Sequence, residues 1–191
     1  MRVIWREDKL TDVEAKLLQA CLDAHAQSAL RQSISSVAVV NSAEGSKDLG
    51  KAIMCALASI GGTHAPLMET WQFLFYLNDH HLFVRMEALQ LSGDRIPGWG
   101  NSFEKDRPDS FWVGVETILA DSFLDVYGKL GYVTDALHKA GKQIYPNPSA
   151  YTAAVAIALK MPPEILEWLF IAGRLNVWTM LFLNQVKKGK V

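Results

Sequence analysis

The sequence has little cysteine, almost no net charge and no apolar run that is free of polar interruptions. Two of its 191 residues are cysteine, and the formal net charge is -1. Cys21 and Cys55 lie in apolar helical patterns and belong to no Cys-x-x-Cys motif or Cys/His cluster, so we expect buried free thiols and no metal site. A near-neutral charge provides no broad basic surface, which argues against a nucleic-acid partner.

The most apolar segment, residues 165–186, contains Glu167, Arg174 and Asn176. These groups are costly in lipid, so we expect a buried core helix and no membrane partner. Residues 1–8 lack the apolar stretch of a signal peptide. Half of the residues are hydrophobic, which suffices for a core. The sequence thus predicts one cytoplasmic domain over residues 1–191, ending in a basic solvated tail at 187–191.

Hydrophobic residues recur at helical spacing nearly throughout, which predicts an all-α fold. Thr11 and Glu14 have the spacing of a capping box and open the first helix. Residues 28–40 are predicted to continue as a second helical stretch, and periodicity leaves open whether 37–40 form helix or strand. The first few residues are the other strand candidate.

Small polar residues, glycines and prolines set the expected limits of the helices that follow. The predicted features are a loop at 41–46, a helix capped by Ser46, a helix stop at Gly61–Gly62, Pro66 in the first turn of a helix that runs through Leu77, and a helix at about 82–91.

Residues 92–109 have no apolar periodicity and are expected to form a loop of functional length. The features predicted after it are a long helix over 110–142 that breaks near Gly128 or Gly131, a rigid turn at 145–149, a helix capped by Ser149, and a last helix opened by Met161–Glu164.

His64 lies at a junction of two predicted helices, after a glycine pair. Backbone amides at such a junction favour negative charge. A neutral histidine there can donate a hydrogen bond to a developing oxyanion or enolate. The alternative is a histidine that only caps a helix end.

The loop over 95–109 has the composition of an anion-binding loop. Gly98 and Gly100 would allow the backbone to approach a ligand closely. Lys105 and Arg107 could meet phosphates or carboxylates. The alternative is a solvated surface loop whose charges cancel.

Arg174 lies in the middle of the most apolar predicted helix. A buried guanidinium needs an anionic partner, because an uncompensated buried charge is very costly. Either a carboxylate such as Glu167 or Glu69 meets it, or a ligand does. The aromatic residues at helical spacing are expected to be core or interface, and they are Trp71, Phe75, Trp112, Trp168, Phe170 and Trp178.

Five motifs follow one another along the chain: His25 near a helix end, Gly61–Ala65, Ile96–Asn101, Tyr145–Ser149 and Ile171–Leu175. Their order over residues 20 to 186 resembles the citrate synthase and citryl-CoA lyase superfamily. In that family a histidine near a helix end is followed by the motif Gly-x-x-His-Gly/Ala. A Pro-Gly-Phe-Gly-His loop comes next and leads into a Lys and Asp-Pro-Arg. The last two motifs are Pro-Asn-x-Asp and Ala-x-Arg-x-x-Gly-Trp.

The resemblance implies a compact citrate-synthase-like helical domain, a two-fold homodimer, and chemistry at the carbon next to a CoA thioester carbonyl. His64 matches the histidine that stabilises the enol. His25 matches a keto-acid ligand, and Arg174 matches a carboxylate-binding arginine. Arg107 matches the loop arginine in a shifted register.

Two positions depart from the family pattern. Asn101 replaces the histidine of Gly-x-Gly-His, and it can donate a hydrogen bond to a carbonyl but cannot titrate. Ser149 replaces the aspartate of Pro-Asn-x-Asp, and serine is a poor base for a carbon acid. The base stays unassigned, and its ionisable candidates are His25, Glu69, Asp106 and Asp109.

The resemblance therefore implies a citryl-CoA lyase or citrate synthase-like enzyme that cleaves or forms a carbon–carbon bond through an enolate. Its partners would be a coenzyme A thioester and a keto acid, with no covalently bound cofactor. Catalytic roles fall to His64, Asn101 and Ser149, substrate binding to His25, Arg107 and Arg174, and coenzyme A binding to Gly98, Gly100 and Lys105. The alternatives are a catalytically inactive relative that binds coenzyme A ligands or regulates, and a helical module that contacts protein only.

Overall fold

A computed structural model describes residues 9–31, 33–60, 65–77, 95–101, 103–105 and 107–189. Over these ranges the chain is helical and contains no strand, which confirms the predicted all-α fold. One isolated antiparallel bridge joins Trp99 and Pro146. The helices are α1 (Asp12–Leu30), α2 (Ile34–Ser46), α3 (Leu49–Ala58), α4 (Leu67–Phe75), the short η1 (Ser110–Trp112), α6 (Val113–Ser122), α7 (Leu124–Lys139), α8 (Pro148–Ala158) and α9 (Ile165–Lys188).

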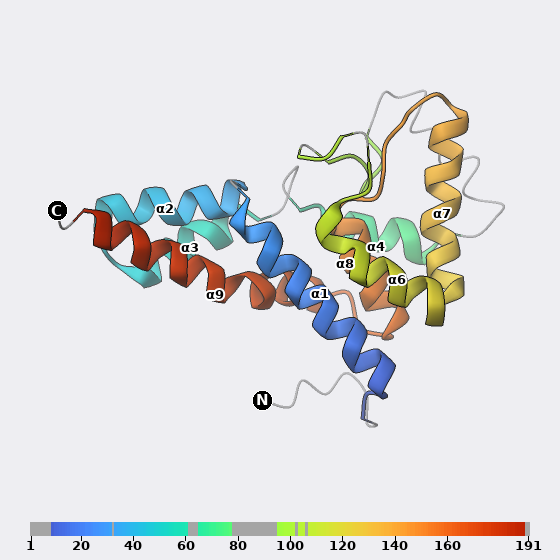
Figure 1. Cartoon of the computed structure of the whole chain (residues 1–191), viewed down its shortest axis with the longest axis horizontal. Helices are drawn as coiled ribbons and strands as arrows, with labels where there is room; N and C mark the ends of the chain where they lie inside the picture. The colour runs from blue at the N-terminus through green and yellow to red at the C-terminus, as the bar shows by residue number, and fades with distance from the viewer. Residues whose placement is uncertain are drawn as a thin grey trace.

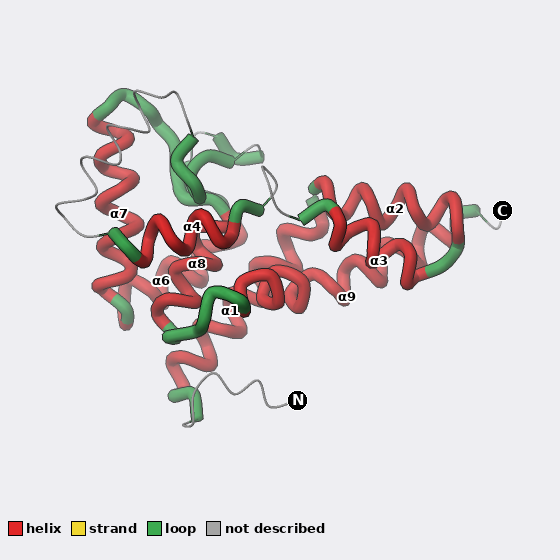
Figure 2. The backbone as a smooth tube through the Cα atoms, turned by 180° about the vertical axis from the view of Figure 1, so that it is seen from behind, coloured by secondary structure: helices red, strands yellow, loops and turns green. Residues whose placement is uncertain are grey.

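The helices form a body with an elongated wing (Figures 1 and 2). The body contains α4, α6, α7 and α8, and the wing contains α2, α3 and the C-terminal part of α9. α1 packs along α9 and also contacts α6 and α8, so it joins the two parts. The region where α1 ends and α2 begins therefore lies between body and wing.

α9 is the central helix of the molecule. It is long and apolar enough to cross a membrane by length and composition, yet it packs against α1, α2, α3 and α8. Its buried side chains include Phe170, Trp178 and Phe182. One face of α9 therefore packs in the core of the described structure, as predicted, and 39% of its most apolar window is buried.

One glycine sets how closely α1 and α9 approach each other. A Cβ atom at Gly173 would lie 2.5 Å from the Cβ of His25 and 2.8 Å from the carbonyl oxygen of Leu22. Only glycine fits this contact without displacing α1. The contact brings His25 next to the segment of α9 that carries Arg174.

Several predicted helix limits in the first half of the chain are wrong. The first helix continues to Leu30 and is followed by its C-cap Arg31, and Ser33 caps α2, its hydroxyl accepting a hydrogen bond from Ser36 N. Residues 37–40 are helical, as are 41–46, which were predicted as a loop. Asp48, not Ser46, caps α3. The Thr11–Glu14 capping box is confirmed.

In the second half, the predicted helix over 110–142 breaks at Phe123 and passes through Gly128 and Gly131 without interruption. Asn147, not Ser149, caps α8, and its side chain accepts from the first free amides. Both cysteines are free, but Cys55 is exposed, contrary to prediction. The predicted N-terminal strand, the Gly61–Gly62 stop and the helix over 82–91 lie outside the described residues.

Candidate functional site

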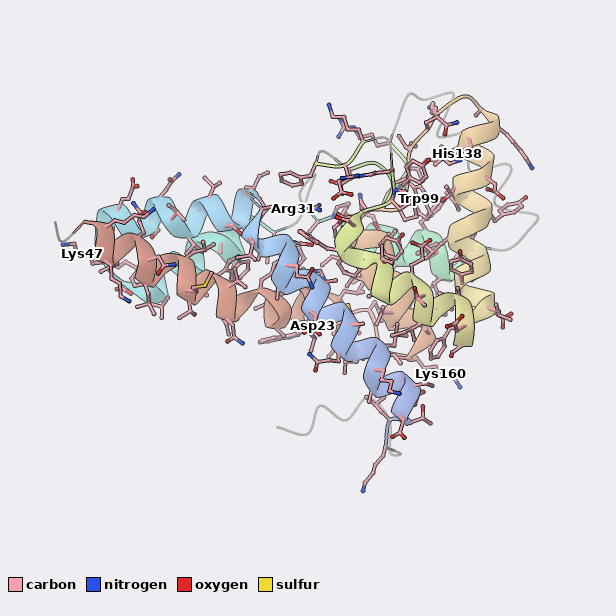
Figure 3. All side chains as sticks on the ribbon, in the orientation of Figure 1. Asp23, Arg31, Lys47, Trp99, His138 and Lys160 are labelled. Atoms are coloured by element: carbon pink, nitrogen blue, oxygen red, sulfur yellow. The ribbon has the colours of Figure 1, made fainter. Side chains whose placement is uncertain are left out.

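A pocket of about 160 Å³ lies where body and wing meet. Its walls come from the end of α1, the residue that caps α2, the first residues of α4 and α8, the loop at 100–109 and the middle of α9. Figure 3 shows Arg31 at this junction, next to the loop. The pocket thus joins segments that are far apart in the sequence. Its lining residues are Ser28, Arg31, Ser33, Ala65, Pro66, Gly100, Asn101, Phe103, Asp109, Asn147, Pro148, Ser149, Phe170 and Arg174.

The glycine loop and the Asn-Pro turn hold each other in place. Gly100 N donates to Tyr145 O over 2.9 Å, and Asn147 N donates to Gly98 O over 2.8 Å. The Asn147 side-chain amide also donates to Gly100 O. Both glycines have positive φ, and a Cβ at Gly98 would clash with the Thr70 methyl group. Two motifs of the family resemblance therefore form one unit.

Arg174 is a buried cation with no acidic partner in the described structure. Its side chain donates from Nη1 to Ser33 Oγ over 3.3 Å, and its guanidinium carbon lies 4.0 Å from the centroid of the Phe170 ring. Neither Glu167 nor Glu69, the predicted carboxylate partners, forms an ion pair with it. Burial lowers the pKa of Arg174 to about 10, so it remains charged at neutral pH.

Two buried donors at the pocket have no hydrogen-bond partner among the residues that the structure describes. They are Arg174 Nε and the hydroxyl of Ser28, and both residues line the pocket. Buried polar atoms are satisfied in the great majority of native structures. Two orphan donors beside one cavity are therefore the arrangement expected for a site that binds an acceptor-rich group such as a carboxylate.

The first residues of α4 and α8 also line the pocket. They are Pro66, which precedes α4, and Asn147, Pro148 and Ser149 at the start of α8. The N-terminus of a helix carries a partial positive charge that favours anions. Ser149 lines the same cavity, although its backbone amide is bound to Asn147 Oδ1. The pocket is therefore electropositive along this wall.

Both terminal nitrogens of Arg31 are bound within the protein. Its guanidinium donates to Asp109 Oδ2 over 2.9 Å, to Glu104 Oε1 over 2.5 Å and to Ser110 Oγ over 3.4 Å. It also lies 4.0 Å from the centroid of the Phe111 ring. This cluster fastens the end of α1 to the loop. Burial acts to raise the pKa of Glu104, but the Ser110 hydrogen bonds and the charges of Arg31 and Arg107 outweigh it and lower that pKa.

Asn101 lies in the pocket wall with much of its hydrogen-bonding capacity in use. Its Nδ2 donates to Asp109 Oδ2 over 2.7 Å, and its Oδ1 accepts from Phe103 N over 2.9 Å. One N–H of the amide group is left for a ligand. Asp109 is also bound by Phe111 N, and its side chain is 1% exposed. Both oxygens of its carboxylate therefore accept hydrogen bonds.

His25 is fully buried behind the pocket and does not line it. Its Nε2 lies 2.9 Å from Thr152 Oγ1, whose hydroxyl donates to Pro148 O. Because the hydroxyl has a single proton, His25 Nε2 must carry the hydrogen, and Nδ1 is left bare. Burial, together with the nearby charge of Arg174, holds the pKa of His25 well below its usual value. The imidazole is therefore neutral at physiological pH.

The predicted site residues separate into two groups. Asn101, Ser149, Arg174 and Gly100 meet at the pocket. Lys105 and Arg107 lie on the exposed side of the loop, where Arg107 pairs with Glu104 over 3.3 Å. Gly98 packs under the loop, and His25 lies one layer behind. His64 and Asp106 lie outside the described residues. The roles assigned to all of these remain predictions.

Sequence reasoning missed Arg31, Ser28 and Ser33. Each lies at or beside the break between α1 and α2, which periodicity placed incorrectly. Ser33 followed by a helical pattern is the typical signal of an N-cap and could have located the break. Ala65, which follows His64, lines the pocket with a φ of 59°. A left-handed alanine at a cavity wall is a strained conformation of the kind that clusters at functional sites.

Comparison with solved structures gives three similar folds. One is citryl-CoA lyase from Hydrogenobacter thermophilus. The match covers 94% of this chain and 72% of the citryl-CoA lyase chain, with 16% sequence identity and a TM-score of 0.77. Citrate synthase from Thermotoga maritima matches 92% of this chain and 50% of its own at 19% identity and a TM-score of 0.80.

The third is ATP citrate lyase from Methanothrix soehngenii, in complex with citrate and coenzyme A. It matches 97% of this chain and 33% of its own at 18% identity and a TM-score of 0.73. No family model and no curated protein matches the sequence. The chain therefore has the helical fold that citrate synthase and citryl-CoA lyase share.

Proposed function

We propose that the pocket at the α1–α9 junction binds the carboxylate of a small organic acid, and that the protein acts on a coenzyme A thioester and a keto acid as citryl-CoA lyase or citrate synthase does. The reaction would cleave or form a carbon–carbon bond through an enolate. One observation carries the proposal. Arg174 is a buried, charged guanidinium that lines the pocket, has a free Nε and meets no carboxylate of the described chain.

A ligand carboxylate would supply what Arg174 lacks. An uncompensated buried charge is strongly unfavourable, and a charge-assisted hydrogen bond from Nε would offset part of that cost. The Ser28 hydroxyl would donate to the same carboxylate, and the starts of α4 and α8 would add favourable potential. Within this proposal, the remaining N–H of Asn101 would donate to the keto oxygen, and Ser149 would face the reacting carbon.

The remaining assignments belong to the same proposal. His64 would stabilise the enolate, and Ala65 beside it is part of the pocket wall. Coenzyme A would run along Gly98 and Gly100 toward Lys105 and Arg107, whose exposed cations suit phosphates. A cytoplasmic location fits a protein that uses this thioester.

A second candidate function is ligand binding without turnover. Asp109 is the carboxylate that lines the described part of the pocket, and Arg31, Asn101 and Phe111 N already bind it. These contacts engage both oxygens of the Asp109 carboxylate. With Ser149 at the position of the family's aspartate, neither group is a competent base for a carbon acid. This observation favours a regulatory or coenzyme A-binding role.

Thermal unfolding with ligands, paired with a turnover assay, tests both candidates. The ligands are coenzyme A, acetyl-CoA, pyruvate, lactate, oxaloacetate, malate and citrate. A ligand at 100 times its Kd stabilises the folded state by about 2.7 kcal/mol, which raises Tm by roughly 5–10 °C for a chain of this size.

A Tm shift accompanied by thiol release supports the enzyme, and His64→Ala should then abolish turnover without lowering the ligand-free Tm. A shift without thiol release supports the binding protein. The absence of any shift, with every ligand, contradicts both candidates.

We also propose a homodimer. Arg174 is the single charged residue between 168 and 186, and it is buried, so the solvent face of α9 carries no charge over this length. Trp168, Leu175 and Leu183 on that helix are 65%, 41% and 49% exposed. An uncharged apolar helix face of this kind is typical of an interface, and a second copy would cover it across a two-fold axis. Trp168→Glu should yield a monomer by light scattering, whereas a wild-type monomer would refute the proposal.

A further inference from the structure

We propose that two serine hydroxyls, those of Ser33 and Ser36, hold the Arg174 guanidinium in the orientation that binds the ligand carboxylate. Ser33 contacts Arg174 directly, whereas Ser36 acts through Ser33 and is a positioning residue. The inference rests on the carboxylate binding proposed above and adds the residues that prepare the arginine for it.

A continuous chain of hydrogen bonds runs from Arg174 on α9 through the start of α2 to the end of α1. Arg174 Nη1 donates to Ser33 Oγ over 3.3 Å. Ser33 Oγ donates to Ser36 Oγ over 3.0 Å, and Ser36 Oγ donates to Ala29 O over 2.7 Å. All four residues are buried. The chain therefore joins three helices at one buried point beside the pocket.

The chemistry of its two ends fixes the direction of this chain. A guanidinium only donates hydrogen bonds, and a carbonyl oxygen only accepts them. Ser33 Oγ accepts from Arg174 and from Ser36 N, the latter over 3.4 Å, so its own proton is left to donate. Ser36 gives its proton to Ala29 O and therefore accepts from Ser33. Both hydroxyl protons point away from Arg174, and hydrogen bonds aligned in this way polarise one another.

The chain ends at a negative partial charge. Ala29 lies in the last turn of α1, where the backbone carbonyls form the negative end of the helix dipole and no basic side chain is present. The hydroxyls thus couple the Arg174 cation to that end of α1. The Phe170 ring lies 4.0 Å from the guanidinium carbon, so the ring and the chain together restrain the group. Nε, which has no partner among the described residues, is left for the ligand.

Ser36 reaches the ligand through this chain. Ser33 and Arg174 line the pocket, whereas Ser36 does not. Without the Ser36 hydroxyl, Ala29 O loses its donor, and the Ser33 hydroxyl is free to turn toward Ser35 Oγ, 3.3 Å away. The ligand must then immobilise the Arg174 side chain itself, which should weaken binding by about two- to tenfold.

Isothermal titration of the full chain with citrate and with pyruvate tests the inference. We expect Ser36→Ala to raise the Kd of the bound acid by about fivefold. Ser35→Ala is the matched control, because Ser35 is also a buried serine of α2 and contacts Ser33 but does not lie between Ser33 and Ala29. It should change the Kd by less than about twofold.

The NMR signals of the Arg174 guanidinium test the restraint without any ligand. In the wild-type protein the Nη protons should give resolved signals, because the bond to Ser33 hinders rotation of the group. Arg174→Met removes these signals and thereby assigns them. They should merge in Ser36→Ala and stay resolved in Ser35→Ala.

The outcomes separate this inference from the proposed function. Equal affinities and equal guanidinium spectra in Ser36→Ala and Ser35→Ala would overturn the positioning role and leave the proposed function intact. If the wild-type protein binds neither acid, the proposed function fails, and the spectra still decide whether the serines hold Arg174. If Ser36→Ala does not fold, a freely rotating Arg174 guanidinium in the wild-type protein would overturn the inference, and a restrained one would support it.

Discussion

Replacement of Arg174 by methionine should make the ligand-free protein more stable. Burial lowers the pKa of Arg174 from 12.5 to about 10. Since one pKa unit corresponds to about 1.4 kcal/mol, the charged guanidinium costs the folded state roughly 3 kcal/mol. Methionine has similar length, carries no charge and packs well against an aromatic ring such as Phe170.

The substitution also removes two favourable contacts. The hydrogen bond to Ser33 contributes about 1 kcal/mol, and the cation–π contact with Phe170 contributes about 1 kcal/mol. The balance leaves a gain of about 1 kcal/mol, which corresponds to a rise in Tm of roughly 2–4 °C. Thermal unfolding followed by circular dichroism at pH 7.5, without ligand, measures this shift.

Arg31→Met is the matched control, since it makes the same substitution at the other arginine of the pocket. Removing Arg31 leaves the buried Asp109 without its cation and leaves Glu104 with the exposed Arg107 alone, which should cost about 3–5 kcal/mol and lower Tm by at least 6 °C. The two variants should therefore shift Tm in opposite directions. A loss of stability in Arg174→Met as large as that in Arg31→Met would refute the reasoning, because it would mean that the fold itself neutralises Arg174.

Further predictions concern His25, the glycine loop and Ala65. Because the pKa of His25 is depressed in the folded state, the unfolded chain binds more protons than the folded protein below about pH 6.5. The free energy of unfolding should therefore fall by up to about 1.4 kcal/mol for each unit by which the pH drops in that range. Urea titrations at pH 7.5 and 5.5 should show this loss of stability, and His25→Gln should reduce it. Gly98→Ala should lower the free energy of unfolding by more than about 2 kcal/mol, because the added methyl group clashes with Thr70 and alanine disfavours the positive φ. Gly100→Ala has the same unfavourable φ but meets open space, so it should lower that free energy by about 1 kcal/mol. Equal losses in urea unfolding would contradict the clash at Gly98. Ala65→Gly should raise stability by up to about 1 kcal/mol in the same assay because it relieves a φ of 59°, and a loss would show that the left-handed conformation is not strained.

Local signals in the sequence predicted the features that neighbouring residues alone decide. The Thr11–Glu14 capping box needs three residues of spacing and nothing from the rest of the fold. The apolar period identified α9 as a core helix despite its length. Of the residues that the motif order assigned to one site, Gly100, Asn101, Ser149 and Arg174 line the pocket, and their roles stay predictions.

Signals that depend on tertiary packing failed. Gly128 and Gly131 are weak helix breakers, and the packing of α7 on α6 and α8 overrides them. The observed break comes at Phe123, where no glycine or proline marks it. Residues 41–46 have the composition of a loop, yet contacts of α2 with α3 and α9 keep them helical.

The pairing of Arg31 was not predictable from the sequence. Its partners Glu104 and Asp109 lie more than 70 positions away, and periodicity carries no information on contacts at that separation. The identity of the arginine that is left free was equally hidden. Glu167 and Glu69 were reasonable partners for Arg174 by composition, and only the geometry shows that they do not reach it.

The crystal structure of the protein grown with lactate or pyruvate tests carboxylate binding at Arg174 most directly. We predict density for a carboxylate within hydrogen-bond distance of Arg174 Nε and the Ser28 hydroxyl, with the Arg31–Asp109 pair unbroken. An acid bound elsewhere, or an Arg174 guanidinium that pairs with a carboxylate of its own chain while the pocket stays empty at saturating ligand, would contradict it.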